Sequence, residues 1–143
     1  MSMLTFLIAM AAAAGSTAPA QDGSTVKEGR TAGGTKVELV VGEFGNATRF
    51  RIAAHDVDCE HGTMSSKAVV RRRLDRSDPG SFSDVSTRAF KAGAVTFRST
   101  RRVEGRVASD GRAWRGSYRE RTRLYEDGDQ IDTCRLRTTW RVR

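Results

Sequence analysis

Apolar and charged residues alternate along the chain from Thr35 onward. In KVELVV (36–41) every second residue is apolar, and in RFRIAA (49–54) the apolar positions Phe50, Ile52 and Ala54 predict the inner face. A period of two is typical of a strand with one face buried and the other in water. Further stretches of this kind are residues 67–74, 81–90 and 94–101. No window keeps helical spacing over three turns, so the pattern predicts an all-β fold.

Two Asp-Gly pairs, at 110–111 and 127–128, mark hairpins in the last third of the chain. Such a pair between alternating apolar residues favours a type I′ turn, in which both central residues have positive φ. A two-residue turn at the first pair sets the register of its two strands. The facing pairs are then Ser109 with Arg112, Val107 with Trp114, Gly105 with Gly116, and Val103 with Tyr118. Facing glycines predict a point where another backbone, a sharp coil of the sheet or a large ring comes close.

The final stretch DTCRLRTTWRVR alternates too, with its apolar residues on one face. These residues are Cys134, Leu136, Trp140 and Val142. They match Trp114, Tyr118 and Leu124 only if the loop around EDGDQ has an odd length, three residues with a bulge or five. The C-terminal half is therefore predicted as a three-strand meander. With about eight strands in total, the expected architecture is an antiparallel β-sandwich or a small closed barrel.

The N-terminus indicates export. An apolar run from Leu4 to Ala14 is too short to span a bilayer, and Ala18-Pro19-Ala20 fits a signal-peptidase site. We therefore predict a signal peptide at 1–20, although no Lys or Arg precedes the run. Residues 21–34 predict a flexible mature N-terminus, and residues 35–143 a single domain. The protein is expected outside the cytoplasm, secreted or periplasmic, with no membrane span once the signal is removed.

The chain has two cysteines, Cys59 and Cys134. Exported small domains commonly gain stability from a crosslink, so we predict a disulfide between them. It would close a loop of about 75 residues and stabilise the fold by ~4 kcal/mol on the chain-entropy model.

Arginine dominates the charge of this basic chain, which has a formal net charge of +8. In the predicted registers, eight arginines point away from the core, some of them directly opposite one another. They are Arg102, Arg106, Arg115, Arg119, Arg121, Arg135, Arg137 and Arg141. Opposed like charges are unfavourable on a sheet, and guanidinium groups bind carboxylate, sulfate and phosphate in bidentate geometry. This face predicts a partner that is an acidic glycan, another anionic polymer or an acidic protein.

A second interpretation of the arginines remains open. Arginine is what a GC-rich genome encodes in place of lysine, and its stem covers a sheet face well, so the face could be solvated and structural. Glu104 and Glu120 are interpreted as lying among the rows, where they pair locally. Few aromatic residues interleave on this face, which disfavours base stacking and hence nucleic acid.

The stretch HDVDCEH (55–61) gathers both histidines, a cysteine and three carboxylates. On a strand, one side would hold His55, Val57, Cys59 and His61, and the other Asp56, Asp58 and Glu60. Zinc requires three or four converging N or S ligands, which this separation and the disulfide oppose. The acids lack the spacing of an EF-hand loop. We therefore predict no metal and no cofactor, and interpret the stretch as a strand end that carries a half-cystine.

No common catalytic motif is present. The enzymatic alternative is a hydrolase that uses His55 or His61 with nearby carboxylates. The leader, the Gly-rich segments GSFSD and VEGRVASDGRAWRGSYR, and the terminal DTCRLRTTWRVR resemble small exported β-rich proteins of unknown function from GC-rich bacteria. That resemblance supports the fold and export and implies no activity. The sequence thus favours a non-catalytic binding protein, with a structural cell-envelope or interaction protein as a further alternative.

Overall fold

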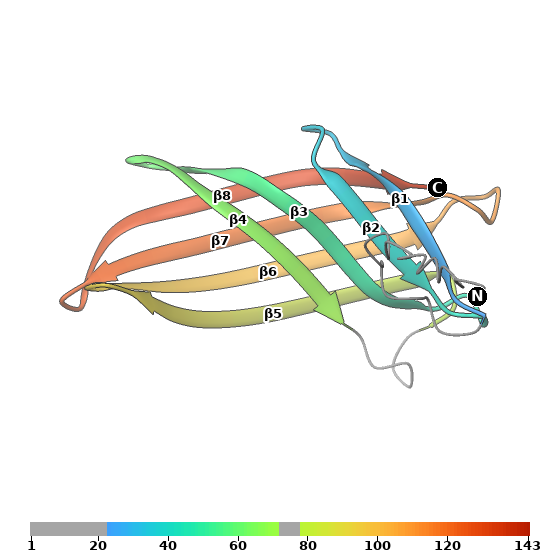
Figure 1. The fold of residues 1–143 in the computed structure, drawn as a ribbon, viewed down its shortest axis with the longest axis horizontal. Helices are drawn as coiled ribbons and strands as arrows, with labels where there is room; N and C mark the ends of the chain where they lie inside the picture. Colours follow the sequence, from blue (N-terminus) through green and yellow to red (C-terminus); the bar gives the residue numbers. More distant parts are fainter. Residues whose placement is uncertain (1–22, 72–77) are drawn as a thin grey trace, which may run out of the picture.

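The computed structural model describes residues 23–71 and 78–143, in which the chain forms eight antiparallel strands (Figure 1). The strands are β1 (Thr25–Thr31), β2 (Lys36–Val41), β3 (Ala47–Cys59), β4 (Gly62–Arg71), β5 (Ser81–Ala92), β6 (Val95–Val107), β7 (Trp114–Glu126) and β8 (Asp129–Val142). The all-β prediction is confirmed. The described residues contain no helix long and apolar enough to cross a membrane. The predicted signal peptide lies outside the described residues.

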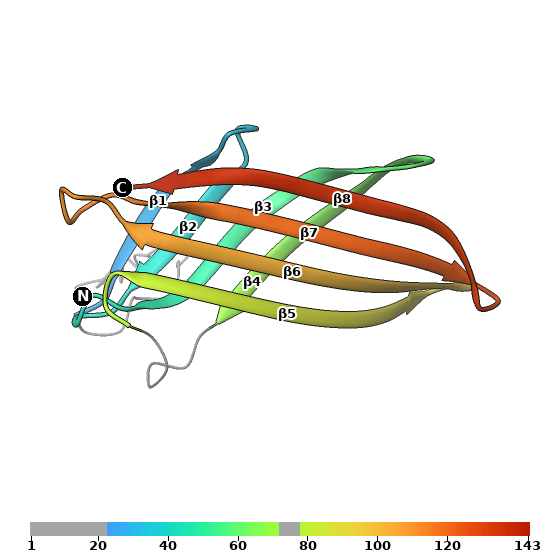
Figure 2. The ribbon, with the colours of Figure 1, turned by 180° about the vertical axis from the view of Figure 1, so that it is seen from behind.

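All eight strands belong to one sheet, in the order β4-β3-β2-β1-β8-β7-β6-β5. The sheet coils so that β1–β4 cross over β5–β8, as the two opposite views show (Figures 1 and 2). The edge strands β4 and β5 are thereby the two ends of the hydrogen-bonded order. The outer surface of β5–β8 faces away from β1–β4, and Figure 2 looks onto that side.

The hydrophobic core fills the space between the two halves. Each half contributes the alternate residues of its strands, because successive side chains on a strand point to opposite faces. The core residues include Val37, Leu39, Phe50, Ile52, Val70, Phe82, Val103, Trp114, Tyr118, Trp140 and Val142. The Phe50 ring lies 5.1 Å from that of Trp140 and 6.2 Å from that of Tyr118, centroid to centroid. Aromatic contacts therefore join β3 to β7 and β8 across the core.

The strand count agrees with the prediction, but the strands are divided differently. Residues 94–101 and 103–107, predicted as separate strands, form the single strand β6. The additional strand is β1, within residues 21–34, where the sequence predicted a flexible segment. Its register with β2 pairs Val26 with Val40 and Gly29 with Val37. The sequence of β1 is rich in Gly and Thr and does not by itself indicate a strand. Its neighbours β2 and β8, one on each side, stabilise it.

The predicted hairpin registers are correct, although both turns differ from the prediction. Gly105 pairs with Gly116 as predicted. Asp110, however, does not have the positive φ of a type I′ turn. It lies in a wider loop, where its carboxylate accepts hydrogen bonds from the amides of Arg112 and Ala113. Asp127-Gly128 is the two-residue turn, with φ of 51° and 83°. The sequence required one extra residue between the two strands to match their inner faces. A register shift between Leu124 and Tyr125 supplies it, and the loop itself has only two residues. A bulge gives the same parity as an odd loop.

The facing glycines of β6 and β7 make room for an aromatic ring, as predicted. A Cβ on Gly105 would lie 2.7 Å from the Trp140 ring, and a Cβ on Gly116 would lie 2.6 Å from it. The Trp140 indole nitrogen donates a hydrogen bond to the Ser117 carbonyl at 3.3 Å. A Cβ would lie nearer still to the Phe82 ring at Gly105 and to the Glu104 backbone carbonyl oxygen at Gly116, so a larger residue at either position would clash with these groups as well as with Trp140.

The predicted disulfide between Cys59 and Cys134 is present. The two residues face each other where the far end of β3 pairs directly with β8, beside the pair Asp58 and Arg135. Because β2 and β1 otherwise separate β3 from β8 in the sheet order, this crosslink fixes the one place where the two strands meet.

Candidate functional site

The eight predicted arginines lie on the outer surface of β6, β7 and β8, and we call this set the arginine face. All eight are exposed, and they oppose one another as predicted. The facing pairs are Arg121 with Arg135, Arg119 with Arg137, Arg115 with Arg141, Arg102 with Arg119, and Arg106 with Arg115. Guanidinium groups therefore form rows that run across three strands, with side chains about 5 Å apart at their Cβ atoms.

The structure adds three arginines that the sequence analysis did not assign to this face. Arg30 of β1 pairs with Arg141, which extends the row of Arg106 and Arg115 to a fourth strand. Arg98 and Arg123 face each other farther along β6 and β7. Their parity matches that of the predicted set, so the same register would have identified them. Arg30 could not be found in this way, because the strand β1 was not predicted.

Two hollows lie on this surface. The first, here called the central groove, has a volume of about 790 Å³. Seven arginines line it, and they are Arg98, Arg102, Arg119, Arg121, Arg123, Arg135 and Arg137. The second, here called the end hollow, has a volume of about 1040 Å³ and is lined by Arg30, Arg106, Arg115 and Arg141. Small residues between the rows, such as Ser117 and Thr139, leave the space open.

Few carboxylates neutralise the arginine face. Within residues 23–71 and 78–143, Arg102 is the one member of the set with a carboxylate within 4.0 Å, that of Glu104 at 3.9 Å. Both side chains of that pair are about half exposed, so it contributes little. Exposed guanidinium groups without carboxylate partners keep their donors available to a bound anion.

Glu120 is not on this face, contrary to the sequence interpretation. Its side chain is 1% exposed and points into the interior, two residues after the core residue Tyr118. Parity alone would have placed it there, because inward residues of β7 recur from Trp114 at every second position. Arg101, which faces Glu120 from β6, is inward for the same reason.

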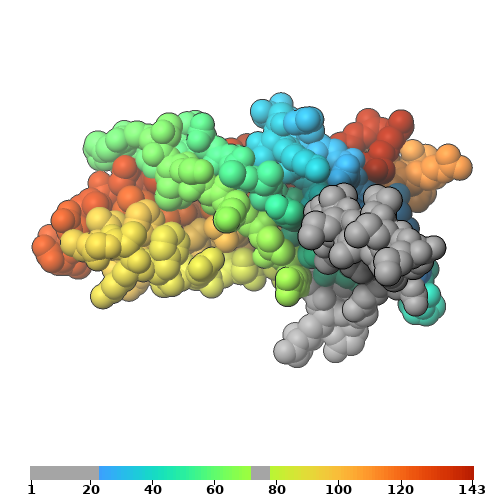
Figure 3. Space-filling view, in the orientation of Figure 1, coloured from blue at the N-terminus to red at the C-terminus, as the bar shows by residue number. Residues whose placement is uncertain are grey.

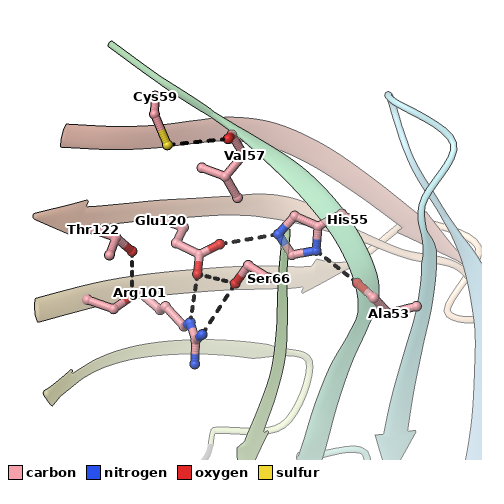
Figure 4. A network of polar contacts seen from close by, with 9 residues as sticks. Ala53, His55, Val57, Cys59, Ser66, Arg101, Glu120 and Thr122 are labelled. Carbon is pink, nitrogen blue, oxygen red and sulfur yellow. Dashed lines mark hydrogen bonds and ion pairs between the residues drawn. The ribbon is translucent and has the colours of Figure 1, made fainter. Parts of the chain in front are cut away.

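Three side chains, those of His55, Ser66 and Arg101, meet at this carboxylate, and together with Glu120 we call them the buried cluster (Figure 4). Arg101 Nε donates to Glu120 Oε1 at 3.1 Å, and Ser66 Oγ donates to the same oxygen at 2.5 Å. His55 Nε2 lies 3.2 Å from Glu120 Oε2. The four residues come from β4, β3, β6 and β7, so the cluster joins the two halves of the sheet through their interior.

A bulge in β3 brings His55 to the cluster. The pairing with β4 shifts between Ile52 and His55, so that Ile52 faces Ala68 and His55 faces Ser66. The inner face therefore changes from even to odd positions, and Ala54, predicted inward, is exposed. The Ala53 carbonyl at this bulge lies 2.8 Å from His55 Nδ1. Bulges commonly redirect side chains in this manner.

The cluster favours charged His55 and charged Glu120. Both imidazole nitrogens face acceptor oxygens, which requires a proton on each. The hydrogen bond to Glu120 raises the pKa of His55 above its usual value of 6.5, against the opposing effect of burial. Burial raises the pKa of Glu120, but the hydrogen bonds from His55, Ser66 and Arg101 outweigh it, so that this pKa is lowered. The cluster then contains two cations and one anion.

This geometry bears on the hydrolase alternative. A general base must offer a free lone pair to the proton it removes. When both His55 nitrogens donate to Ala53 and Glu120, neither offers one. Ser66, which supplies the hydroxyl of the cluster, donates its hydrogen bond to Glu120. The arrangement is better suited to holding strands together than to activating a nucleophile.

The second histidine lies elsewhere. His61 is in the turn after β3, where its Nδ1 is 3.5 Å from the Asp132 carboxylate of β8. Together with Glu60, these residues place three ligand atoms within 4.8 Å of one another. Strand parity predicted that the histidines of this stretch point away from its own acids. That is so for His55, whereas His61, which lies in the turn, is close to Glu60. The Asp132 carboxylate also accepts hydrogen bonds from the backbone amides of Glu60 and Thr133. These bonds fix its position, so no ion is needed to explain it.

No family model matches this chain, and no curated protein or solved structure is similar to it. The resemblance to small exported β-rich proteins therefore stays an expectation from the sequence. Disulfide bonding is compatible with a location outside the cytoplasm.

Proposed function

We propose that the protein is an extracytoplasmic binding protein whose arginine face binds an anionic polymer, in the first place an acidic glycan. The observation that carries this proposal is the rows of opposed arginines, in which one carboxylate of the described residues, that of Glu104, comes within 4.0 Å of a guanidinium group. Opposed like charges cost a few tenths of a kcal/mol for each pair when the face is free. An anion laid between two rows would remove that repulsion and gain charge-assisted hydrogen bonds.

The shape of the face supports an extended ligand. The central groove and the end hollow lie along the same strands, and Arg102, Arg106, Arg115 and Arg119 connect them. A chain of negatively charged sugars could contact guanidinium groups in both. Tyr125 is the single aromatic residue among those that line the central groove, and Arg98 covers its ring at 5.1 Å. Base stacking therefore has little support, and a glycan is favoured over a nucleic acid.

Retention on immobilised heparin tests the proposal. The wild-type protein should bind at low salt and elute as the salt concentration rises, because multivalent charge contacts are screened. The variant Arg119→Ser/Arg137→Ser should elute at clearly lower salt. A matched control is Lys36→Ser/Arg51→Ser, which removes the same charge from the other half of the sheet, where both cations pair with Glu38. Equal retention of the two variants would reject the arginine face as the site.

A further inference from the structure

A separate cavity lies on the inner side of the sheet, between the edge strands β4 and β5. These strands end the hydrogen-bonded order, so no ladder closes the gap between them. Figure 3 shows β4 in green beside the yellow of β5 and β6 on this side of the molecule. The cavity has a volume of about 170 Å³ and reaches the buried cluster. Its lining includes Met64, Ser66, Lys67, Arg88, Phe90 and Arg101. We call it the seam cavity.

The charges around the seam cavity do not balance. Its floor carries the buried cluster, in which charged His55 and Arg101 exceed Glu120 by one positive charge. Lys67 and Arg88 add two exposed cations at the lining, while Glu120 is the one acid among the described residues that line the cavity. An uncompensated charge in a partly buried site is costly, and an anionic ligand would neutralise it.

Arg101 has a donor group directed away from Glu120. Its Nε donates to Glu120, and its Nη2 lies 3.4 Å from Ser66 Oγ. Figure 4 shows the remaining nitrogen pointing away from both partners. The side chain is 17% exposed and lines the cavity, so this nitrogen can meet a ligand. The guanidinium is thus held rigidly on one side and open on the other, which is a preorganised arrangement for binding a carboxylate.

The lining is also partly apolar. Met64 of β4 and Phe90 of β5 lie on opposite sides of the cavity. Phe90 is 41% exposed, and its ring stacks on that of Phe97 at 4.8 Å. The cavity volume corresponds to roughly five or six water molecules at about 30 Å³ each, which is room for a small organic acid. An apolar tail of a few carbon atoms would cover the exposed edge of Phe90.

We propose that the seam cavity binds a small carboxylic acid with a short apolar tail, with its carboxylate on Arg101 and the charges of Lys67 and Arg88 close by. This site uses other arginines than the arginine face, because Arg101 points inward and the eight arginines of that face point outward, although Glu120 borders both the central groove and the seam cavity.

Titration with butyrate, followed by NMR of the arginine Nε–H signals, tests the proposal. The Arg101 signal should shift and saturate, and acetate should bind more weakly because it has no tail. Lys67→Ser/Arg88→Ser should weaken butyrate binding about five- to tenfold, a total of about 1–1.4 kcal/mol, since exposed cations contribute weakly to charge pairing. Both residues are exposed, so the variant should fold. Arg119→Ser/Arg137→Ser is the control and should bind butyrate normally.

Three results would overturn the proposal. The first is an Arg101 signal that does not saturate with butyrate, and the second is unchanged affinity in Lys67→Ser/Arg88→Ser. The third is inorganic phosphate binding more tightly than butyrate, which would reject the carboxylic acid as the ligand class. If butyrate shifts only the signals of the arginine face, the Arg101 signal has not responded, and the proposal is overturned in the same way as by the first result. Heparin retention does not depend on this cavity, so each proposal can fail alone.

Discussion

The two faces of β6 and β7 carry the same kinds of charged side chain in opposite situations. On the inner face, Arg101 is held by Glu120 and Ser66 in a buried cluster with His55. On the outer face, Arg102 and Arg119 oppose each other in water, with Glu104 as a distant partner. The inner charges are bonded and hold the two halves of the sheet together. The outer charges contribute little to stability, and their donors are left largely unpaired by carboxylates among the described residues. Burial thus separates structural charge from available charge.

The largest expected effect comes from Glu120→Gln. It leaves the buried cations without their carboxylate, and breaking a buried ion pair costs about 3–5 kcal/mol. Urea denaturation should show this as a lower free energy of unfolding. Glu104→Gln, on the outer face, should change the same quantity by no more than ~0.5 kcal/mol. If Glu120→Gln and Glu104→Gln lower the free energy of unfolding by similar amounts, the inner charges are no more structural than the outer ones.

The pH dependence of stability should report the buried cluster. Because the pKa of Glu120 is lowered on folding, its contribution is complete above about 4.5 and is lost as the pH falls through the folded value. The pKa of His55 is raised, so its contribution is complete below about 6.5 and is lost as the pH rises through the folded value. The groups that face this imidazole are Ala53, Glu120, Arg101 and the edge of Tyr118.

Unfolding free energies should therefore be highest between about pH 4.5 and 6.5. The decrease at higher pH should be smaller than the loss in Glu120→Gln, since only one of three donors to Glu120 changes. His55→Gln cannot titrate and should flatten this alkaline side of the curve. A wild-type curve that rises from pH 6.5 to 9, or an unchanged curve in His55→Gln, would contradict the assignment of a charged His55.

Tyr118→Phe distinguishes bonded from merely buried polar groups. The Tyr118 hydroxyl is buried without a hydrogen bond among the described residues, and burial raises its pKa strongly. Removing it should leave the free energy of unfolding unchanged or increase it by up to about 1 kcal/mol, because an unsatisfied buried group is lost. Thermal and urea denaturation measure this. A decrease of more than ~1 kcal/mol would show that the hydroxyl is bonded to the cluster.

The smallest expected effect on stability is that of Arg119→Ser/Arg137→Ser. Removing two opposed cations should raise the free energy of unfolding by a few tenths of a kcal/mol or leave it unchanged. Urea denaturation at low salt, where repulsion is least screened, is the appropriate measurement. A loss above ~1 kcal/mol would indicate that these arginines stabilise the sheet and that the face is structural.

Sequence periodicity predicted much of the fold for a physical reason. A two-residue period fixes which face of a strand is buried, so the register of β6, β7 and β8 followed from matching Val103 with Tyr118 and Val107 with Trp114. The same parity predicted the arginine rows. It also places Glu120 inward, two residues after Tyr118, which the interpretation of this carboxylate as a member of the arginine rows missed.

Three features could not be predicted from periodicity. The bulge at Ala53 and Ala54 shifts His55 to the inner face, and nothing in the local sequence marks the change. The strand β1 is stabilised by its neighbours β2 and β8, which are distant in sequence from each other. Ser66 lies in the buried cluster because the bulge shifts the pairing of β3 with β4, so that Ser66 faces His55. Each of these depends on tertiary pairing, which a local pattern does not contain.

The most direct test of the arginine face is which guanidinium groups touch an acidic glycan. Arginine Nε–H signals can be followed by NMR while a heparin oligosaccharide is added at constant salt. We predict that signals from Arg102, Arg119, Arg121 and Arg137 shift together and saturate, while those of Arg51 and inward-facing Arg101 stay in place. Uniform small shifts across all exposed arginines, or a saturating response centred on Arg51, would contradict the proposed binding face.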